Sequence, residues 1–390
     1  MRILVWSFVP PSPDSAYWHW LKGGMESVGH QVIAVDAYAL TEVFGLRRTE
    51  DILLAYARAY RVQAALVLPQ NFVGLDFLQR LGAMGVRRVG FRYDDGLIAG
   101  PGMTRPHPTL LSLYAYADVA CDLTVTCCRR AVSYVTGAGF HAPIYLPLPF
   151  AWQTVDAAEA PQEPIIVYAG SPKYQPAGPL SARVAVARSL IAAGLPIELH
   201  HDAWATVPGC EAAARPTPSR EGFYRILRTS TVNLVVAADG GPTIHPMVKL
   251  LNLEIAAAGG MQVTSHCVEL ADYFTSETDI AYAEGVADFV TQARHYLDNP
   301  LKARQLGRNS RKAMERLAGW DVWWSDVAAR LAAQGQPLDL TALPVSPDPV
   351  ESTLLAAANA ALAHAYTKTG ETVMAAVYAH NARRYDAAKE

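Results

Sequence analysis

The chain has 390 residues, of which 51% are hydrophobic and 18% are charged, and its formal net charge is −3. This composition can bury sizeable cores and excludes an intrinsically disordered chain. Because the charge is slightly negative and basic residues do not cluster, nucleic acid is excluded as the expected partner.

The N-terminus, MRILVWSFVPPSP, has only a short apolar run before Pro10 and Pro11. We therefore expect a first strand there and not a signal peptide. No run approaches the ~20 apolar residues of a membrane span. The cysteines match no zinc or redox spacing, which favours free thiols in a cytoplasmic protein; they are Cys121, Cys127, Cys128, Cys210 and Cys267.

Short apolar strands alternate with helical segments over residues 1–150. This alternation is typical of a parallel, doubly wound sheet, so we predict an N-terminal Rossmann-like domain. The predicted strands are Arg2–Phe8, Gln31–Asp36, Ala64–Leu68, Arg88–Tyr93 and Leu123–Cys127. The predicted helices are Ala16–Gly29, Glu50–Arg61, Leu75–Met84, Leu110–Ala117 and Arg129–Thr136.

A proline-rich stretch, Pro147–Pro164, reads as a linker, after which the same alternation resumes. We predict a second Rossmann-like domain over 160–334, separated from the first by a cleft. Its predicted strands include Ile165–Ala169 and Ile197–His200, and its predicted helices include Leu180–Ala193, Glu221–Thr229, Ala287–Asn299 and Pro300–Ala318.

A second linker, Gln334–Pro349, precedes a predicted helical hairpin within residues 350–390. Its helices, Ser352–Thr367 and Glu371–Asp386, flank Gly370 with a weakly tetratricopeptide-like spacing. One such unit is too few for independent stability, since about three are needed. The hairpin therefore either packs on the body of the protein or docks a partner protein.

The segment Val232–Thr264 reads as a strand, a glycine-rich loop, a helix, a Gly-Gly turn and a strand. Within the helix, Glu254 has only Leu250, Leu251, Ala257 and Ala258 beside it. A carboxylate on such a face is costly unless something supplies hydrogen bonds. A bound ligand could supply them, and so could a remote arginine or backbone N–H.

Two loops of the second domain could hold phosphate at strand ends. Small residues let a ligand approach the backbone, lysine adds charge, and a helix N-terminus favours an anion. The candidates are Gly170, Ser171 and Lys173 in the first loop, and Gly240, Gly241, Thr243, His245 and Lys249 at the second.

The first domain offers fewer candidates. Its first strand-to-helix loop lacks G-x-G-x-x-G, which argues against a nicotinamide cofactor, and Asp36 reads as a turn residue. Asp94 and Asp95 follow a strand and could contact sugar hydroxyls or form an ordinary turn. His19 could act as a base or sugar contact, or simply pack within its helix.

These residues resemble a known family. Lys249-x4-Glu254-Ile-Ala-x2-Gly259-Gly260-Met-Gln-Val-Thr264 is similar to the CgeB-like (spore-maturation type) glycosyltransferases, as are Glu269-Leu270-x2-Tyr273-Phe274 and Tyr296-Leu297-x-Asn299-Pro300. Tyr93-Asp94-Asp95 and the strand Cys121–Thr126 agree more loosely. The resemblance covers roughly residues 85–320.

The resemblance implies the GT-B fold and a relationship to the retaining group 1 glycosyltransferases. It implies sugar transfer from a nucleotide-sugar donor, retention of configuration and no obligatory metal or other cofactor. Glu254 then corresponds to the ribose-binding glutamate, and Lys249, with Lys173 second, to the cation at the pyrophosphate. The acidic residue expected eight positions before Glu254 is Pro246 here.

Two alternatives stay open beside sugar transfer. One is another GT-B enzyme, either a nucleotide-sugar epimerase or a hydrolase, and the other is a non-catalytic, degenerate transferase that binds a partner. The sequence leaves the nucleotide base, the donor sugar and the oligomeric state open. The acceptor is a sugar, a protein or a small metabolite.

Overall fold

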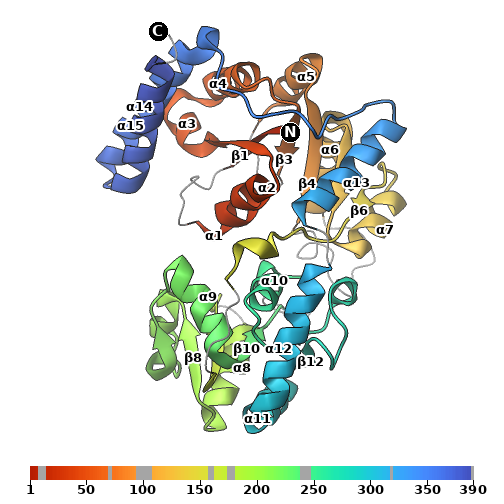
Figure 1. The fold of residues 1–390 in the computed structure, drawn as a ribbon, viewed down its shortest axis with the longest axis vertical. Coiled ribbons are helices and arrows are strands. Elements are labelled where there is room, and N and C mark those ends of the chain that lie inside the picture. Colours follow the sequence, from red (N-terminus) through yellow and green to blue (C-terminus); the bar gives the residue numbers. More distant parts are fainter. Residues whose placement is uncertain are drawn as a thin grey trace.

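The computed structural model describes residues 1–7, 15–68, 73–93, 108–156, 162–173, 181–237, 247–316 and 319–387. Two α/β domains stand one above the other, and a helical hairpin lies beside the first of them (Figure 1). Each domain is built on a six-stranded sheet in which every pair of strands runs parallel. The predicted fold class is thereby confirmed.

The sheet of the first domain has the order β2-β1-β3-β4-β5-β6. Alternate residues of β1 face opposite layers: Ile3 and Val5 enter one core, whereas Leu4 and Trp6 enter the other. The strands are β1 (Arg2–Ser7), β2 (Gln31–Asp36), β3 (Ala64–Val67), β4 (Arg87–Arg92), β5 (Leu123–Thr126) and β6 (Ile144–Tyr145). The helices of this domain are α1 (Ala16–Trp18), α2 (Gly24–Ser27), α3 (Ala37–Phe44), α4 (Leu46–Ala59), α5 (Leu75–Ala83), α6 (Pro108–Ala120) and α7 (Arg129–Gly137).

The sheet of the second domain has the order β12-β11-β10-β7-β8-β9. Its first and fourth strands, β7 and β10, are neighbours, so the strand order reverses between them, and ligands bind at such a switch point. The strands are β7 (Glu163–Ala169), β8 (Ile197–His200), β9 (Ala214–Arg215), β10 (Ser230–Val235), β11 (Gln262–Ser265) and β12 (Ala281–Ala283). The helices are α8 (Ala182–Ala192), α9 (Arg220–Thr229), α10 (Leu250–Ala257), α11 (Val286–Asp298) and α12 (Pro300–Glu315).

Helix α13 (Trp320–Ala333) follows the second domain in sequence but packs on the first. The Trp320 indole N–H donates to the carbonyl oxygen of Trp20 at 3.1 Å, and that of Trp324 points at the sulfur of Met25 at 3.4 Å. The domain prediction assigned residues up to 334 to the second domain, and this helix was not predicted. The chain thus returns to the domain in which it began.

The polypeptide crosses between the domains at two places that lie together. One crossing runs through Phe150 and Ala151, and the other enters α13 at Gly319. A Cβ atom built on Gly319 would stand 4.0 Å from the carbonyl oxygen of Phe150. The two crossings therefore lie next to each other.

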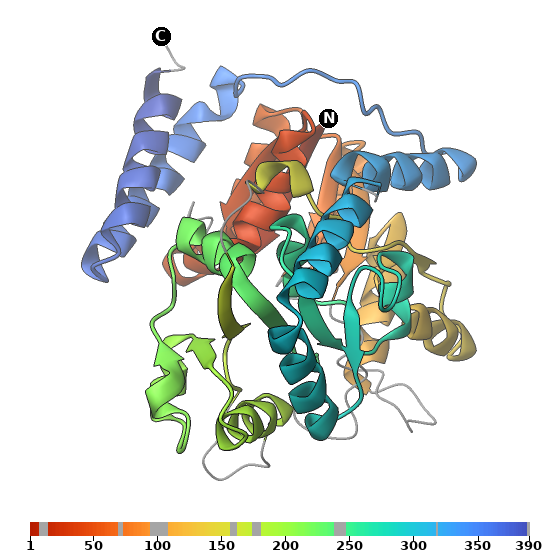
Figure 2. The ribbon, with the colours of Figure 1, turned by 60° about the horizontal axis from the view of Figure 1, so that its bottom comes forward.

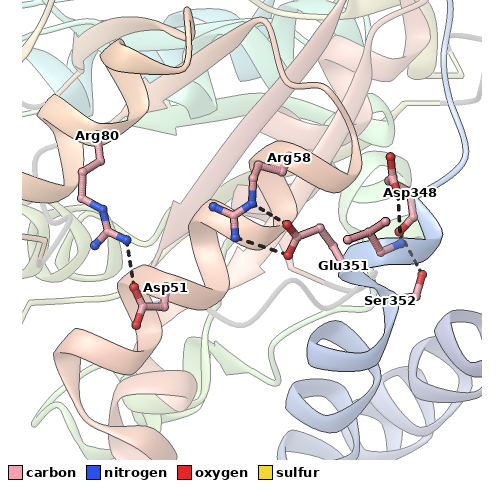
Figure 3. Close-up of polar contacts among 7 residues, drawn as sticks. Asp51, Arg58, Arg80, Asp348, Glu351 and Ser352 are labelled. Atoms are coloured by element: carbon pink, nitrogen blue, oxygen red, sulfur yellow. Dashed lines mark hydrogen bonds and ion pairs between the residues drawn. The ribbon is translucent and has the colours of Figure 1, made fainter.

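The C-terminal hairpin consists of α14 (Pro349–Lys368) and α15 (Thr372–Ala387), joined at Gly370, which has a φ of 80°. It packs beside α3 and α4 of the first domain, where Leu355 and Leu362 join that domain's core (Figure 1). The Arg58 guanidinium on α4 pairs with Glu351 at the start of α14 (Figure 3). The hairpin thus packs on the body of the protein, as the first interpretation of this segment predicts.

Asp36 ends β2 and caps the helix that follows. Its carboxylate accepts a hydrogen bond from the Ala39 N–H at 2.8 Å and another from the Tyr366 hydroxyl of α14. Burial raises the pKa of Asp36, and these hydrogen bonds oppose that shift. The residue therefore ends the strand as predicted and also ties the hairpin to the sheet.

His30 makes the stability of the first domain depend on pH. Both ring nitrogens are buried without a hydrogen-bond partner in the described part of the chain, and the ring meets Trp324 edge-on. Burial, followed by the charge of the N-terminal ammonium, lowers the pKa of His30 from 6.5 to about 4. Between these values the unfolded chain binds a proton that the folded protein does not, so stability falls as the pH falls through this window.

We therefore expect the free energy of unfolding to drop by about 1–2 kcal/mol between pH 6.5 and pH 4 because of His30, with allowance for its partial exposure. Urea unfolding of His30→Gln against the parent protein measures this slope. The matched control is His380→Gln, because that side chain is exposed on α15. A slope that survives in His30→Gln contradicts the assignment.

All five cysteines are free thiols, and Cys127, Cys128, Cys210 and Cys267 are buried. None of the helices in the described ranges is long and apolar enough to cross a membrane.

Candidate functional site

The candidate site lies where strands of the second sheet end, close to the first helix of the first domain. Strands β7 and β10 run side by side, with Ile166 beside Val232 and Val167 beside Asn233. Their carboxyl ends therefore open at the same edge, next to helix α10. The loop after β7 and the end of β10 therefore lie at the switch point of the sheet.

Glu254 on α10 is paired with Arg220, the first residue of α9. The Arg220 guanidinium donates through Nη1 to Glu254 Oε1 at 3.0 Å. It also stacks over the Tyr224 ring, 4.4 Å from the ring centroid, and donates to the Tyr224 hydroxyl. Helix α9 begins at this point because the Ser219 hydroxyl accepts the N–H of Gly222. This capping hydrogen bond thus fixes the position of Arg220 at the start of α9.

The carboxylate of Glu254 is nearly enclosed, with 6% of its side chain exposed, against 18% for Arg220. Burial raises the pKa of Glu254, and the charge and hydrogen bond of Arg220 oppose that shift. Among the described residues, only Arg220 hydrogen-bonds to this carboxylate, through Oε1. Oε2 is therefore left to accept hydrogen bonds from a ligand.

Buried amides hold α10 against β11. The Asn252 side chain donates to Gln262 Oε1 at 2.8 Å and to Thr264 Oγ1 at 3.0 Å, and Gln262 donates back to the Asn252 carbonyl. The turn at Gly259-Gly260 requires glycine at both positions. Gly259 has a φ of 77°, and a Cβ atom on Gly260 would stand 2.4 Å from the Leu227 carbonyl oxygen. These contacts set the position of Glu254 relative to the sheet.

Lys249 stands immediately before α10 and is half-buried. Its backbone N–H donates to Asn252 Oδ1 at 2.9 Å, which closes the first turn of the helix. Lys249 and Glu254 therefore belong to one short helix, with the lysine at its positive end.

The loop after β7 is held by two side chains from within the domain. The Trp204 indole donates to the Gly170 carbonyl at 2.8 Å, and Arg183 donates to the Ser171 carbonyl at 2.9 Å. Lys173 is exposed and has a φ of 51°, in the left-handed region. Gly170 and Ser171 thus present an ordered backbone with a lysine beside it.

His19 joins the site from the first domain. It opens a π-helical segment, His19–Gly23, between α1 and α2, and such segments occur frequently at functional sites. Its Nε2 is buried and has no hydrogen-bond partner among the residues that the structure describes. Burial, followed by the positive charge of Arg220, lowers the pKa of His19. The imidazole is therefore neutral at pH 7, and it lies close enough to Arg220 of the second domain for that charge to affect its pKa.

The other predicted site residues lie outside the described residues. They are Asp94 and Asp95 after β4, and Gly240, Gly241, Thr243 and His245 between β10 and α10. Within the described ranges, no group of three His, Cys, Asp or Glu side chains is arranged to hold a metal ion.

An ion pair between Arg129 and Asp272 joins the two domains. Arg129 at the start of α7 donates through Nη2 to both carboxylate oxygens of Asp272, at 2.7 and 2.8 Å. The Arg129 backbone N–H donates to Glu269 at 3.0 Å, and the Tyr145 hydroxyl donates to Asp272. The hydrogen bond to Asp272 raises the pKa of Arg129. This contact is one link between the two domains, whose ribbons Figure 2 shows with the bottom of Figure 1 turned forward.

Comparison with known proteins assigns a class to this arrangement. Residues 183–327 match the family model described as glycosyl transferase-like. The match includes Arg220 and Glu254 and runs from α8 into α13. The chain is a glycosyltransferase with the GT-B fold.

Solved structures share the fold of this glycosyltransferase. HepE of Anabaena in complex with UDP-glucose has a TM-score of 0.57 at 10% identity, covering 85% of this chain and 100% of HepE. Sucrose-phosphate synthase from Thermosynechococcus elongatus has a TM-score of 0.60 at 13% identity, covering 86% of this chain and 100% of the synthase. No curated protein sequence matches the chain.

The glycosyltransferase site contains one residue that sequence reasoning missed. Arg220 lies just before the predicted helix Glu221–Thr229, and nothing local ties it to Glu254, which is 34 positions away. The usable signal was the lack of a basic neighbour on the Glu254 helix, which called for a remote partner. One of the alternatives considered for Glu254, a remote arginine, is the one observed.

Proposed function

We propose that this glycosyltransferase uses a nucleotide-sugar donor and transfers the sugar with retention of configuration and without an obligatory metal. The observation that carries the proposal is the buried Glu254, held by Arg220 beside the switch point of the second sheet. In our proposal, Glu254 Oε2 accepts hydrogen bonds from the ribose hydroxyls of the donor. Arg220 keeps the carboxylate ionised and oriented for that contact.

Donor phosphates are assigned to the two loops beside β7 and β10. Gly170, Ser171, Gly240, Gly241 and Thr243 are proposed to surround the diphosphate with backbone N–H groups. Lys249, Lys173 and His245 are proposed to stabilise the charge that develops on the leaving group. One preorganised donor of this kind can contribute roughly 3 kcal/mol to the transition state.

The acceptor is assigned to the first domain. Asp94 and Asp95 are proposed to hold its hydroxyls, and His19 is proposed to contact it as a neutral imidazole. Closure of the two domains would exclude water and limit hydrolysis of the donor. We propose that the protein belongs to the CgeB-like subgroup, on the sequence pattern around Glu254. We also propose a cytoplasmic location, on the spacing of its cysteines.

Thermal unfolding with UDP, GDP, CDP, ADP and dTDP tests the donor proposal. A ligand at 100 times its dissociation constant stabilises the folded protein by roughly 2.7 kcal/mol. We expect one nucleotide to raise the melting temperature above the others and to lose this effect in Glu254→Ala. The matching sugar donor is then consumed only when an acceptor is present.

Other outcomes select a different function. Donor consumption without acceptor indicates a hydrolase or an epimerase. No shift with any nucleotide, in a cooperatively folded preparation, indicates a degenerate transferase that binds a partner.

A further inference from the structure

A pocket of about 350 Å³ lies between the edge of the first sheet and the C-terminal hairpin. Residues Gln31–Val35 of β2 line one side, and Tyr378 and Arg384 of α15 line the other. This pocket is separate from the candidate donor site, because β2 belongs to the first domain and forms the outer edge of its sheet. The proposed sugar transfer does not use it.

The wall made by β2 offers backbone hydrogen bonds. Among the described residues, strand β2 pairs only with β1, and the Gln31 N–H donates to the Met1 carbonyl at 2.8 Å. Because backbone groups alternate along a strand, the amides of Ile33 and Val35 also face β1, whereas those of Val32 and Ala34 face the open edge. At the end of β2 the hairpin covers the strand edge, because the Tyr378 hydroxyl of α15 lies against the backbone of Asp36.

A buried acceptor also lines the pocket. The Asn359 side chain on α14 is fully buried, and its amide nitrogen donates to the Tyr56 hydroxyl at 2.8 Å and to the Leu355 carbonyl at 2.7 Å. Its Oδ1 is buried with no hydrogen-bond partner in the described ranges. A buried acceptor in this state is costly until a donor reaches it.

The charge at the rim of the pocket favours an anion. Arg384 is exposed, and the structure gives it no ion pair with any described residue. The other two charges at the pocket, Lys22 and Glu26, neutralise each other at 2.5 Å. The net charge offered to an occupant is therefore positive.

We propose that this pocket binds an extended, acidic peptide segment that adds to the edge of β2. Such a peptide supplies N–H and C=O groups at about the 3.3 Å rise per residue of a strand, so it pairs with Val32 and Ala34. Its donors face the wall of the pocket that contains Asn359, and its carboxylate meets Arg384. A saccharide could stack on the tyrosine rings, but it would leave the outward backbone groups of Val32 and Ala34 without strand pairing.

Panning a random peptide library on the full-length protein tests the proposal, with an enriched peptide then measured by fluorescence anisotropy. We expect enriched sequences to be acidic and to alternate β-branched residues. Ala34→Pro removes one outward amide without removing a hydrogen bond to β1, because proline is tolerated at an edge position of this kind. It should weaken binding at least about tenfold. Arg384→Gln should weaken binding of the acidic peptide but should not weaken binding of an analogue in which glutamine replaces the acidic residues.

A change in the peptide alone keeps the test independent of protein folding. N-methylation of alternate peptide amides removes the backbone donors and keeps every side chain, and we expect binding to be lost. Three results each overturn the proposal: no peptide is enriched over a control protein, the methylated peptide binds as well as the parent, or chitotetraose displaces the peptide. Tyr38→Ala, an exposed change on α3 outside the pocket, is the matched control.

Discussion

Replacing Glu254 by glutamine is expected to lower kcat/KM for sugar transfer by roughly 100-fold, because hydrogen bonds to a charged acceptor contribute about 1.5–3 kcal/mol each. The substitution keeps the shape of the side chain and removes its charge. It weakens the ribose contact proposed for Oε2 and also leaves the partly buried Arg220 guanidinium without its anion. Steady-state kinetics with the donor identified by thermal unfolding measures the effect.

The matched control for this variant is Glu50→Gln. Glu50 is also a buried carboxylate on a helix, but it belongs to the first domain, where it accepts the Gly74 N–H at 2.7 Å. The Glu50→Gln substitution should lower the free energy of unfolding and leave the affinity for the donor unchanged. A Glu254→Gln protein with the parent kcat/KM, or equal losses in the two variants, would remove Glu254 from the site.

Replacing Trp320 by alanine is expected to lower the free energy of unfolding by about 3–5 kcal/mol, the usual loss for a buried tryptophan. Trp320 is fully buried, and its ring lies 5.7 Å from that of Trp20 and 6.1 Å from that of Phe91. The substitution also removes the donor to the Trp20 carbonyl. Urea unfolding followed by tryptophan fluorescence and circular dichroism gives the change.

Tyr38→Ala is the control for Trp320→Ala, because the Tyr38 side chain is 55% exposed. Its effect should stay within about 0.5 kcal/mol. If Trp320→Ala costs less than about 1 kcal/mol, then α13 is not part of the core of the first domain.

Local sequence patterns predicted most of the fold, because strands and helices of an α/β domain each carry their own hydrophobic signal. Helix α13 was missed although Trp320, Trp323, Trp324, Val327 and Leu331 follow helical spacing. Its position was beyond local reasoning, because nothing within the helix shows that it packs on Trp20, 300 positions earlier. The short strand β12, of three residues, has too little pattern to be predicted.

The candidate site was predicted less completely than the fold, because its partners come from separate elements. The lack of a basic neighbour correctly marked Glu254 as a carboxylate that needs a partner. The partner, Arg220, depends on how α9 and α10 pack, and packing is a property of the tertiary structure. The approach of His19 to Arg220 likewise depends on how the two domains face each other. The roles assigned to these residues remain predictions.

We expect any opening of the two domains to pivot at the two neighbouring crossings between them. Because Phe150 and Gly319 lie together, a rotation about this point would move both connections least. Such an opening would separate His19 from Arg220 and would break the contact between Arg129 and the partly buried Asp272. The Arg129 N–H bond to Glu269 and the Tyr145 bond to Asp272 would break with it, so we expect salt alone to be insufficient to separate the domains.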